Sequence, residues 1–286
     1  EAPADAGADG EPANAAGGRV PMLTSIRDSY AAAIEMYFEA ANTYQKAGEA
    51  SGRTATSLVE EGTLALDEPV DAHLLELAGD RLTADIHGLS TIQSLYFDTP
   101  DHLLIRRSLE KPLFKEKMRL RSYGLAGPDD PIFWEIKRKC QGLVYKRRIQ
   151  TTSRALRAGA GFDSQIGREL SAFLEQYPSL SPRMLLLYDR TAFFGVGDLR
   201  LTFDRSIRFR TDRLSLSAGL DGSPLLEEGA VLMEIKTAAA IPLWLARALS
   251  QNQIFKTSFS KYGTAFTQGP VSSKEVMKVG ESVSKP

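Results

Sequence analysis

Between residues 91 and 237, seven segments rich in β-branched, aromatic and aliphatic residues follow one another, separated by turn sequences such as Gly127-Pro128-Asp129-Asp130. Only one helical segment, Phe162 to Tyr177, falls between them, and a second, Ile241 to about Phe255, follows the last. So many consecutive strands with so few helices indicate an α+β fold built on an antiparallel sheet or barrel. The predicted strands are Thr91–Phe97, Leu113–Tyr123, Ile132–Cys140, Leu143–Thr152, Met184–Phe194, Leu199–Arg210 and Ala230–Thr237.

The rest of the chain is predicted to flank this sheet. Residues 1–20 have the composition of a disordered leader, residues 21–62 form a helix and a linker, residues 63–267 form the sheet domain, and residues 268–286 are a loose tail. The N-terminal helix has one apolar face, made by Leu23, Ile26, Tyr30, Ala33, Tyr37, Ala40 and Tyr44. Such a face packs on its own domain, docks a partner or self-associates, and the sequence leaves these alternatives open.

Several classes of protein are excluded by what the sequence lacks. No apolar run approaches the roughly 20 residues that span a bilayer. The single cysteine, Cys140, excludes a disulfide framework and a cysteine-based zinc site. Neither the phosphate-binding loop of P-loop proteins nor the glycine motif of dinucleotide-binding folds is present. We therefore expect a cytoplasmic protein without a membrane span, and a membrane-protein partner remains open.

The charges are segregated along the chain. Residues 1–101 contain 5 Lys and Arg against 18 Asp and Glu, whereas residues 102–150 contain 13 against 5. Residues 151–286 contain 17 against 13, so the formal net charge of −1 conceals an acidic front and a strongly basic middle. This asymmetry indicates an anionic ligand for the basic part, with an ordinary mixed-charge surface as the alternative.

The basic residues collect on one face of the predicted strands, because side chains two residues apart point to the same face. Like charges directly across a sheet repel, so such a face needs an anion to compensate it. The polar members of this face, strand by strand, are Lys115, Lys117, Arg119 and Arg121; Glu135, Lys137 and Lys139; Lys146 and Arg148; Tyr188 and Arg190; Arg200, Thr202 and Asp204; and Glu234 and Lys236.

A face of this kind suits a chain of phosphates, which arginine forks and lysine ammonium groups bind. No nucleic acid partner is expected, because aromatic stacking residues are not interleaved with the cations. Glu135 and Glu234 would repel phosphate unless a divalent cation bridged carboxylate and phosphate, which predicts that Mg²⁺ or Mn²⁺ binds here with these two residues as ligands. The alternative for each glutamate is a salt bridge to the lysine two residues later.

Seven motifs follow one another along the chain: Ser94–Asp101 (SLYFDTPD), Met118–Gly124 (MRLRSYG), Trp134–Lys139 (WEIKRK), Tyr188–Arg190 (YDR), Arg200–Asp204 (RLTFD), Met233–Lys236 (MEIK) and Phe259–Gly263 (FSKYG). In this order they resemble the motifs of the VTC domain, the polyphosphate polymerase branch of the triphosphate tunnel metalloenzymes. The resemblance runs from about Asp71 to Phe266. It implies an eight-stranded antiparallel tunnel with flanking helices, and transfer of the ATP γ-phosphate onto a growing polyphosphate chain with release of ADP.

The resemblance also implies roles for single residues. Arg119 and Arg121 match the R-x-R motif that grips nucleotide or chain phosphates, and Glu234 matches the metal-binding glutamate. Phosphoryl transfer needs positioning and charge neutralisation more than a side-chain nucleophile, because the acceptor phosphate is itself the nucleophile. The predicted catalytic set is completed by Lys137, Arg190, Arg200 and Lys261. Alternation along the strands adds as ATP-binding residues Lys115, Lys146, Arg148 and Lys236.

One segment departs from the family pattern. The family has a strand with an E-x-K motif, or with a lysine followed by tyrosine, before the helix that corresponds to Asp71–Leu82. In this chain Asp67 occupies about the position of that lysine, and Pro69 fits poorly in a central strand. Two alternatives to a polymerase therefore remain: a catalytically impaired module that binds polyphosphate or nucleotide, and a hydrolase of triphosphate or polyphosphate in the same tunnel.

Overall fold

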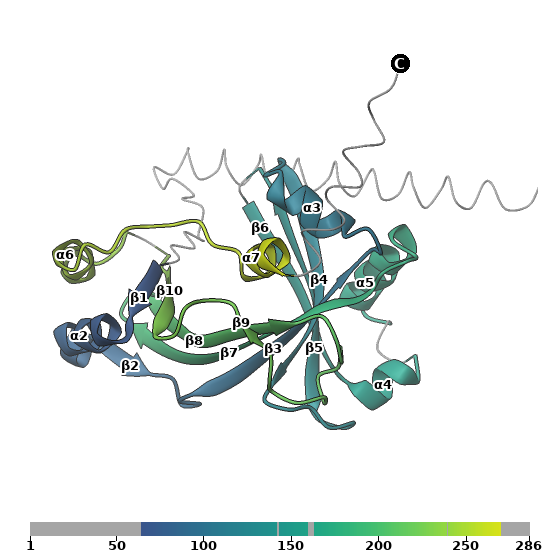
Figure 1. Cartoon of the computed structure of the whole chain (residues 1–286), viewed down its shortest axis with the longest axis horizontal. Coiled ribbons are helices and arrows are strands. Elements are labelled where there is room, and N and C mark those ends of the chain that lie inside the picture. The colour runs from purple at the N-terminus through teal and green to yellow at the C-terminus, as the bar shows by residue number, and fades with distance from the viewer. Residues whose placement is uncertain (1–63, 142, 160–162, 239, 270–286) are drawn as a thin grey trace, which may run out of the picture. The chain divides into compact units, whose positions relative to one another are not determined.

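In the computed structural model, the described part of the chain comprises residues 64–141, 143–159, 163–238 and 240–269, with side chains from Asp71 onward. The predicted leader, the predicted N-terminal helix and linker, and residues 270–286 of the predicted tail lie outside it. Ten strands form one antiparallel sheet (Figure 1). They are β1 (Leu64–Asp67), β2 (Leu82–Ala84), β3 (Ser90–Asp98), β4 (Phe114–Tyr123), β5 (Pro131–Cys140), β6 (Leu143–Thr152), β7 (Ser181–Gly195), β8 (Arg200–Arg210), β9 (Ser223–Pro224) and β10 (Ala230–Lys236).

Eight of these strands form a continuous hydrogen-bonded path in the order β1, β10, β8, β7, β3, β4, β5, β6. The two short strands lie beside it, β2 on β7 and β9 on β8. Within the described residues the path is open, with β1 and β6 at its two ends. The predicted α+β class and the eight antiparallel strands are confirmed, whereas backbone hydrogen bonds among the described residues do not close the sheet into a ring.

The helices pack against both faces of the sheet. The face that α7 packs against is called the inner face below, and the opposite one the outer face. On the outer face, α5 packs against β4 and β5, whereas α2 and α6 pack against β8 and β10. The helices are α2 (Glu68–Ala78), which a 3-10 turn (Gly79–Arg81) extends, α3 (Leu103–Leu109), α4 (Ser153–Arg157), α5 (Gln165–Gln176), α6 (Leu243–Gln251) and α7 (Lys261–Gln268).

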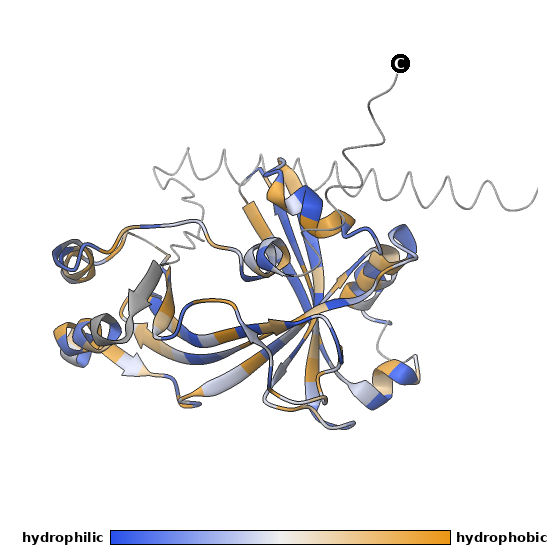
Figure 2. Cartoon of the chain, viewed as in Figure 1, coloured by the Kyte–Doolittle hydropathy of each residue, from blue (hydrophilic) through white to orange (hydrophobic). Residues whose placement is uncertain are grey.

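All seven strands predicted from the sequence are present within a few residues of their predicted ends, and the alternation of hydropathy along them is visible in Figure 2. The divergent first strand is also present, as the four residues of β1, which pair with β10. Pro69 does not interrupt this strand, because it lies in the first turn of α2, where its missing N–H has no partner to lose. The predicted helix Asp71–Leu82 begins earlier, at Glu68, and ends at Ala78.

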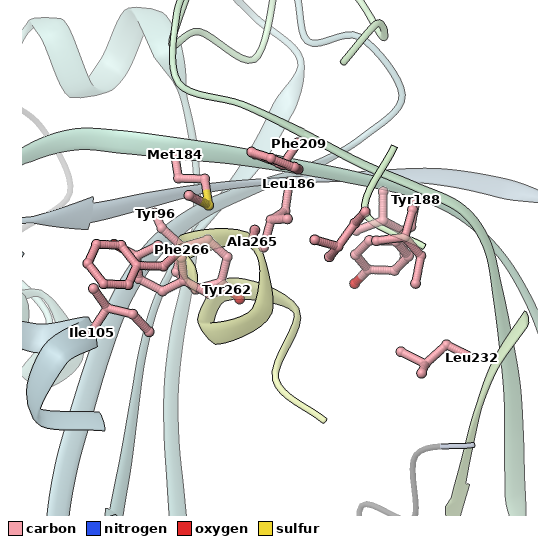
Figure 3. Packing of buried hydrophobic residues seen from close by; sticks show 13 residues of the cluster. Tyr96, Ile105, Met184, Leu186, Tyr188, Phe209, Leu232, Tyr262, Ala265 and Phe266 are labelled. Atoms are coloured by element: carbon pink, nitrogen blue, oxygen red, sulfur yellow. The ribbon is translucent and has the colours of Figure 1, made fainter. Parts of the chain in front are cut away.

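The core of the inner face is formed where α7 packs on the middle of the sheet. Tyr262 and Phe266 of α7 pack with Tyr96 of β3, Ile105 of α3 and Met184 of β7 (Figure 3). All five side chains are at most 8% exposed. This packing fixes the start of α7, and with it Lys261, relative to the strands.

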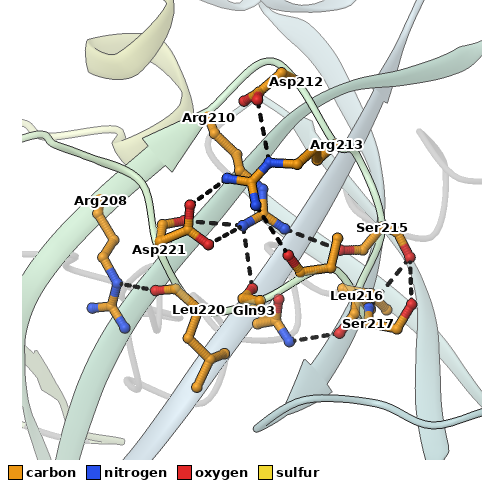
Figure 4. A network of polar contacts seen from close by, with 12 residues as sticks. Gln93, Arg208, Arg210, Asp212, Arg213, Ser215, Leu216, Ser217, Leu220 and Asp221 are labelled. Carbon is orange, nitrogen blue, oxygen red and sulfur yellow. Dashed lines mark hydrogen bonds and ion pairs between the residues drawn. The ribbon is translucent and has the colours of Figure 1, made fainter.

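The outer face of β3 and β7 is covered by the long connection between β8 and β9. Leu216 of this connection is buried against Leu95 and Leu185. Arg210 holds the connection in place by donating to the carbonyl oxygens of Gly219 and Asp221, at 3.2 and 3.1 Å (Figure 4). Because its guanidinium donates hydrogen bonds to backbone carbonyl oxygens of this connection, Arg210 stabilises the fold and is not part of the cationic inner face.

Asp98, at the end of β3, joins α3 and α7 to the sheet. This carboxylate is fully buried and accepts hydrogen bonds from the backbone N–H groups of Leu104 and Ile105, at 2.9 and 3.0 Å, and from the hydroxyl of Tyr262, at 3.0 Å. We expect Asp98→Asn to lower the free energy of unfolding by about 2 kcal/mol, because one acceptor oxygen is replaced by a donor. Urea denaturation measures this change, with Asp129→Asn, an exposed partner of Arg154, as the control. Equal midpoints for the two variants would contradict the anchoring role.

Candidate active site

The inner face carries two ion-pair clusters, each built around one buried carboxylate. The first, called the Glu135 cluster, lies on β4, β5 and β6. Glu135 is 1% exposed and lies directly opposite Arg119 on one side and Arg148 on the other. Its carboxylate oxygens lie 2.7 Å from Arg119 Nε, 2.7 Å from Lys146 Nζ and 3.6 Å from Arg148 Nε.

The electrostatics of this cluster keep its members charged. Burial alone would raise the pKa of Glu135, but Arg119, Arg121 and Lys146 outweigh burial and bring it to about 2. Burial also opposes the charge of Arg119, yet Tyr96 and Glu135 raise the pKa of its guanidinium. Three cations converge on a single carboxylate, so the cluster keeps a net positive charge at neutral pH.

The second group, called the Asp204 cluster, lies on β7, β8, β10 and the start of α7. Arg190 grips Asp204 with two parallel hydrogen bonds of 2.5 and 2.8 Å, and its Nη2 lies 3.5 Å from Glu234. Lys261 Nζ lies 2.7 Å from the same aspartate, and Lys236 Nζ lies 2.5 Å from Glu234. Two carboxylates and three cations thus form one network.

Asp204 is the most deeply buried member of this network, with no exposed surface. Burial raises the pKa of its carboxyl, but Lys261 and Arg190 outweigh burial and hold the pKa below its usual value. Burial opposes the charge of Arg190 as well, while the hydrogen bonds to Asp204 raise the pKa of its guanidinium. Both groups therefore stay ionised throughout the physiological range.

Tyrosines join the two clusters across the middle of the sheet. Arg119 Nη1 donates to the hydroxyl of Tyr96 at 3.0 Å, and Arg121 Nη2 donates to the hydroxyl of Tyr188 at 3.2 Å. The ring of Tyr188 also lies under two members of the Asp204 cluster, with Arg190 Cζ at 5.2 Å and Lys261 Nζ at 4.8 Å from its centroid.

Strand register brings lysines into rows beside the Glu135 cluster. Lys117 lies opposite Lys137, which lies opposite Lys146, and in the next row Lys115 lies opposite Lys139. Lys117 Nζ donates to Ser260 just before α7, at 3.2 Å, so this row faces the start of α7. Like charges that lie opposite each other across neighbouring strands repel, and an anion bound over these rows would relieve that repulsion.

Buried polar atoms near Glu234 also lack partners. The Nε of Arg200 and the hydroxyl of Thr202 are inaccessible to solvent, and within the described residues neither has a hydrogen-bond partner. Thr202 lies directly opposite Glu234, and Arg200 lies opposite Lys236. Unsatisfied buried donors and acceptors are rare in native proteins, so these two groups mark this end of the inner face as a candidate for ligand binding.

The structure separates the two predicted metal ligands. Glu135 and Glu234 belong to different clusters, and Glu234 is instead linked through Arg190 to Asp204. No group of three or more His, Cys, Asp or Glu side chains gathers as a metal site among the described residues. Two carboxylates nevertheless fit Mg²⁺ or Mn²⁺, because these ions are often held by one or two carboxylates together with substrate phosphates. The donor chemistry of Asp204 and Glu234 therefore fits such an ion.

Some residues of this site were missed as functional candidates from the sequence. Asp204 was placed on the correct face by alternation but given no role. Tyr96 and Ser94 lie opposite Arg119 and Arg121 in the register of β3 with β4, and each hydroxyl accepts a hydrogen bond from its arginine. The signal was the R-x-R spacing on β4 facing the S-x-Y spacing on β3, which is readable only once the two strands are known to be neighbours.

The fold and the site together define a class of protein, an antiparallel α+β domain with a cationic inner face. The family model of the VTC domain matches residues 53–268. The chain belongs to the VTC domain family. Within the described residues, no helix is both long and apolar enough to cross a bilayer.

The solved structures to which the chain is similar are distant in sequence. HpAC1 from Hippeastrum, reported with a dominant triphosphatase activity, is 14% identical, with 74% of this chain and 97% of that chain covered and a TM-score of 0.44. A Bacillus halodurans protein proposed to be an adenylate cyclase is 12% identical, with 71% and 94% covered and a TM-score of 0.46. The PH1819 protein from Pyrococcus horikoshii is 11% identical, with 72% and 94% covered and a TM-score of 0.39. A search of curated proteins found no match.

Proposed function

We propose that this protein is a metal-dependent polyphosphate polymerase, which transfers the γ-phosphate of ATP to the end of a growing polyphosphate chain. The observation that carries the proposal is the row of lysines 117, 137 and 146, which lie opposite one another on three neighbouring strands beside the Glu135 cluster, with Lys117 facing the start of α7. A single small anion would compensate only part of this surface, whereas a chain of phosphates neutralises it along its length. Membership of the VTC family supports the same ligand.

In this proposal, the residues of the chain bind and orient the two substrates. Arg119 and Arg121 grip phosphate oxygens, and Arg190, Arg200 and Lys261 neutralise charge at the other cluster. The lysine row with Lys137 positions the acceptor chain, and the predicted ATP-binding residues, Lys115, Lys146, Arg148 and Lys236, lie beside these groups. A terminal phosphate oxygen of the acceptor attacks the γ-phosphorus, the bond to the β-phosphate oxygen breaks, and ADP leaves.

The divalent ion fits at Asp204 and Glu234, where it would neutralise phosphate charge that builds up in the transition state. The metal role predicted for Glu135 stays a prediction. Its contacts with Arg119 and Lys146 support a different contribution, which is to hold these two cations in place. Lys236 and Arg190 balance the charge of Glu234 when no ion is bound.

One observation favours the second candidate, a catalytically impaired binding module. The first strand, β1, contains only Leu64, Ala65, Leu66 and Asp67, and therefore contributes no cation. A tunnel that lacks this lysine still has the rest of its cationic face, so the loss of the lysine is expected to reduce catalysis more than binding.

One assay separates the candidates. The full chain is incubated with ATP and Mn²⁺, and ADP, free phosphate and long phosphate chains are resolved. A polymerase forms ADP and chain phosphate in equal amounts with little free phosphate. A hydrolase forms ADP and free phosphate without chains. Tight ATP or polyphosphate binding without ADP release would contradict the polymerase and support the binding module.

A further inference from the structure

Two groups hold the guanidinium of Arg119, and one of them is a tyrosine. The Nε of Arg119 donates to Glu135 at 2.7 Å, and the Nη1 of Arg119 donates to the hydroxyl of Tyr96 at 3.0 Å. A guanidinium has five N–H donors in one plane, so these two bonds fix its orientation and leave other donors, including those of Nη2, for a ligand. The register of β3 with β4 places Tyr96 directly opposite Arg119, so the contact is built into the sheet.

Tyr96 is in turn stacked on α7. Its ring lies 4.4 Å from that of Tyr262, with 19° between the planes. Tyr262 is anchored by its hydrogen bond to Asp98, and its neighbour Lys261 reaches Asp204. Tyr96 therefore contacts both Arg119 of the Glu135 cluster and the helix that carries Lys261 of the Asp204 cluster.

We propose that Tyr96 is a positioning residue, which orients Arg119 toward bound phosphate and couples that orientation to the seating of α7 and Lys261. The proposal rests on the proposed phosphate-binding function of the inner face. Tyr96 itself is 8% exposed and acts through the two residues that it contacts. Removal of its hydroxyl leaves the aromatic stack intact and releases one end of the guanidinium.

The surroundings of Tyr96 make this arrangement sensitive to pH. From β4 it faces Arg119, Lys117 and Arg121; from α7 it faces Tyr262; and its other cluster neighbours, Met184 of β7 and Ile105 of α3, are apolar. Burial raises the pKa of Tyr96, but the three cations outweigh burial and lower it to about 8.

The sign of the pH effect follows from linkage. A phosphate anion bound at Arg119 disfavours a phenolate at Tyr96, because both are negative. Tyr96 therefore stays protonated in the complex, whereas in the free protein it loses its proton above about pH 8. The affinity for a phosphate chain is therefore expected to fall as the pH rises through about 8. Ionisation of the phosphate ligand itself also changes affinity, but it acts equally on wild type and variant and cancels in their ratio.

The test compares Tyr96→Phe with Tyr177→Phe. Tyr177 is an equally buried tyrosine on the outer face, whose hydroxyl donates to Glu116 at 2.7 Å, so it controls for the loss of a buried hydroxyl. Tripolyphosphate affinity is measured by calorimetry between about pH 7 and pH 9. We expect Tyr96→Phe to bind about tenfold more weakly at pH 7, as for loss of one charge-assisted hydrogen bond, and its affinity relative to wild type to recover toward pH 9. Tyr177→Phe is expected to follow wild type at every pH.

A second measurement tests the coupling of Tyr96 to Arg119 in the absence of any ligand. Ultraviolet titration of phenolate absorbance should show one tyrosine ionising near pH 8 in wild type, absent in Tyr96→Phe and shifted to higher pH in Arg119→Gln. If Tyr96→Phe keeps this early titration, or binds tripolyphosphate as wild type does at both pH values, Tyr96 does not position Arg119. If wild type binds no tripolyphosphate, the proposed function fails, and persistence of the early titration in Arg119→Gln would separately overturn the coupling of Tyr96 to Arg119.

Discussion

Glu234→Gln is expected to reduce metal-dependent turnover of ATP at least about 100-fold, in the range found when one strong electrostatic stabiliser is lost. Arg190 links Glu234 on β10 to Asp204 on β8, and these two carboxylates are the proposed ligands of the divalent ion. A neutral amide is a far weaker ligand for Mg²⁺ or Mn²⁺ than a carboxylate, so charge neutralisation at the transferred phosphate would be lost.

The same variant should bind phosphate without metal at least as well as wild type. Removal of a negative charge takes away repulsion toward phosphate and releases Lys236, which lies 2.5 Å from Glu234. Turnover with Mn²⁺ and calorimetric binding of tripolyphosphate in chelator measure the two effects. Glu169→Gln is the matched control, because Glu169 is a half-buried partner of Arg147 on the outer face. Full activity of Glu234→Gln would exclude this residue as a metal ligand.

Arg119→Ala is expected to weaken binding of tripolyphosphate by about 10- to 100-fold, as for loss of one or two charge-assisted hydrogen bonds. Arg121→Ala should act in the same direction, because Arg121 lies on the same face of β4, held by Ser94 and Tyr188. The fold should survive the loss of Arg119, since Glu135 keeps Lys146 and Arg148 as partners.

Salt dependence separates this effect from a local structural change. Several cations that bind one polyanion release its counterions, so affinity falls steeply with salt, and each arginine removed should make the fall less steep. The slopes known for duplex DNA do not transfer to a flexible phosphate chain. Arg147→Ala, on the outer face of β6, is the control and should keep the wild-type slope. Affinity independent of salt would mean that the inner face is not the binding surface.

Strand positions and faces could be read from the sequence because they depend on local pattern. The period of two assigned Arg119 and Glu135 to one face and Met118 and Trp134 to the other, and the structure has both sets as predicted. On the outer face, the predicted pattern of apolar residues did not account for a buried charged residue. Glu116 lies there among apolar residues, where Arg138 and the hydroxyl of Tyr177 compensate its charge.

The sequence patterns did not predict the short helices. Helix α7 has only eight residues, too few for a clear helical period, yet its N-terminal signal is present, since the Ser260 hydroxyl accepts a hydrogen bond from the backbone N–H of Gly263. Helix α3 has seven residues and is capped from a distance by Asp98. The stability of both comes from packing against the sheet, which a local pattern does not contain.

What the sequence determined by itself was the antiparallel α+β class, the strand order along the chain, the cationic face and the family, because each rests on residues close together or on motifs in order. Only the tertiary structure decided which charges meet. Glu135 and Glu234 looked equivalent, each two residues before a lysine, but register places Glu135 opposite Arg119 and Arg148, and Glu234 next to Arg190 and Asp204. Strand pairing and the stacking of Tyr96 on Tyr262 join residues far apart in the chain. Such contacts depend on the energy of the whole packed sheet, and no short window of sequence specifies them.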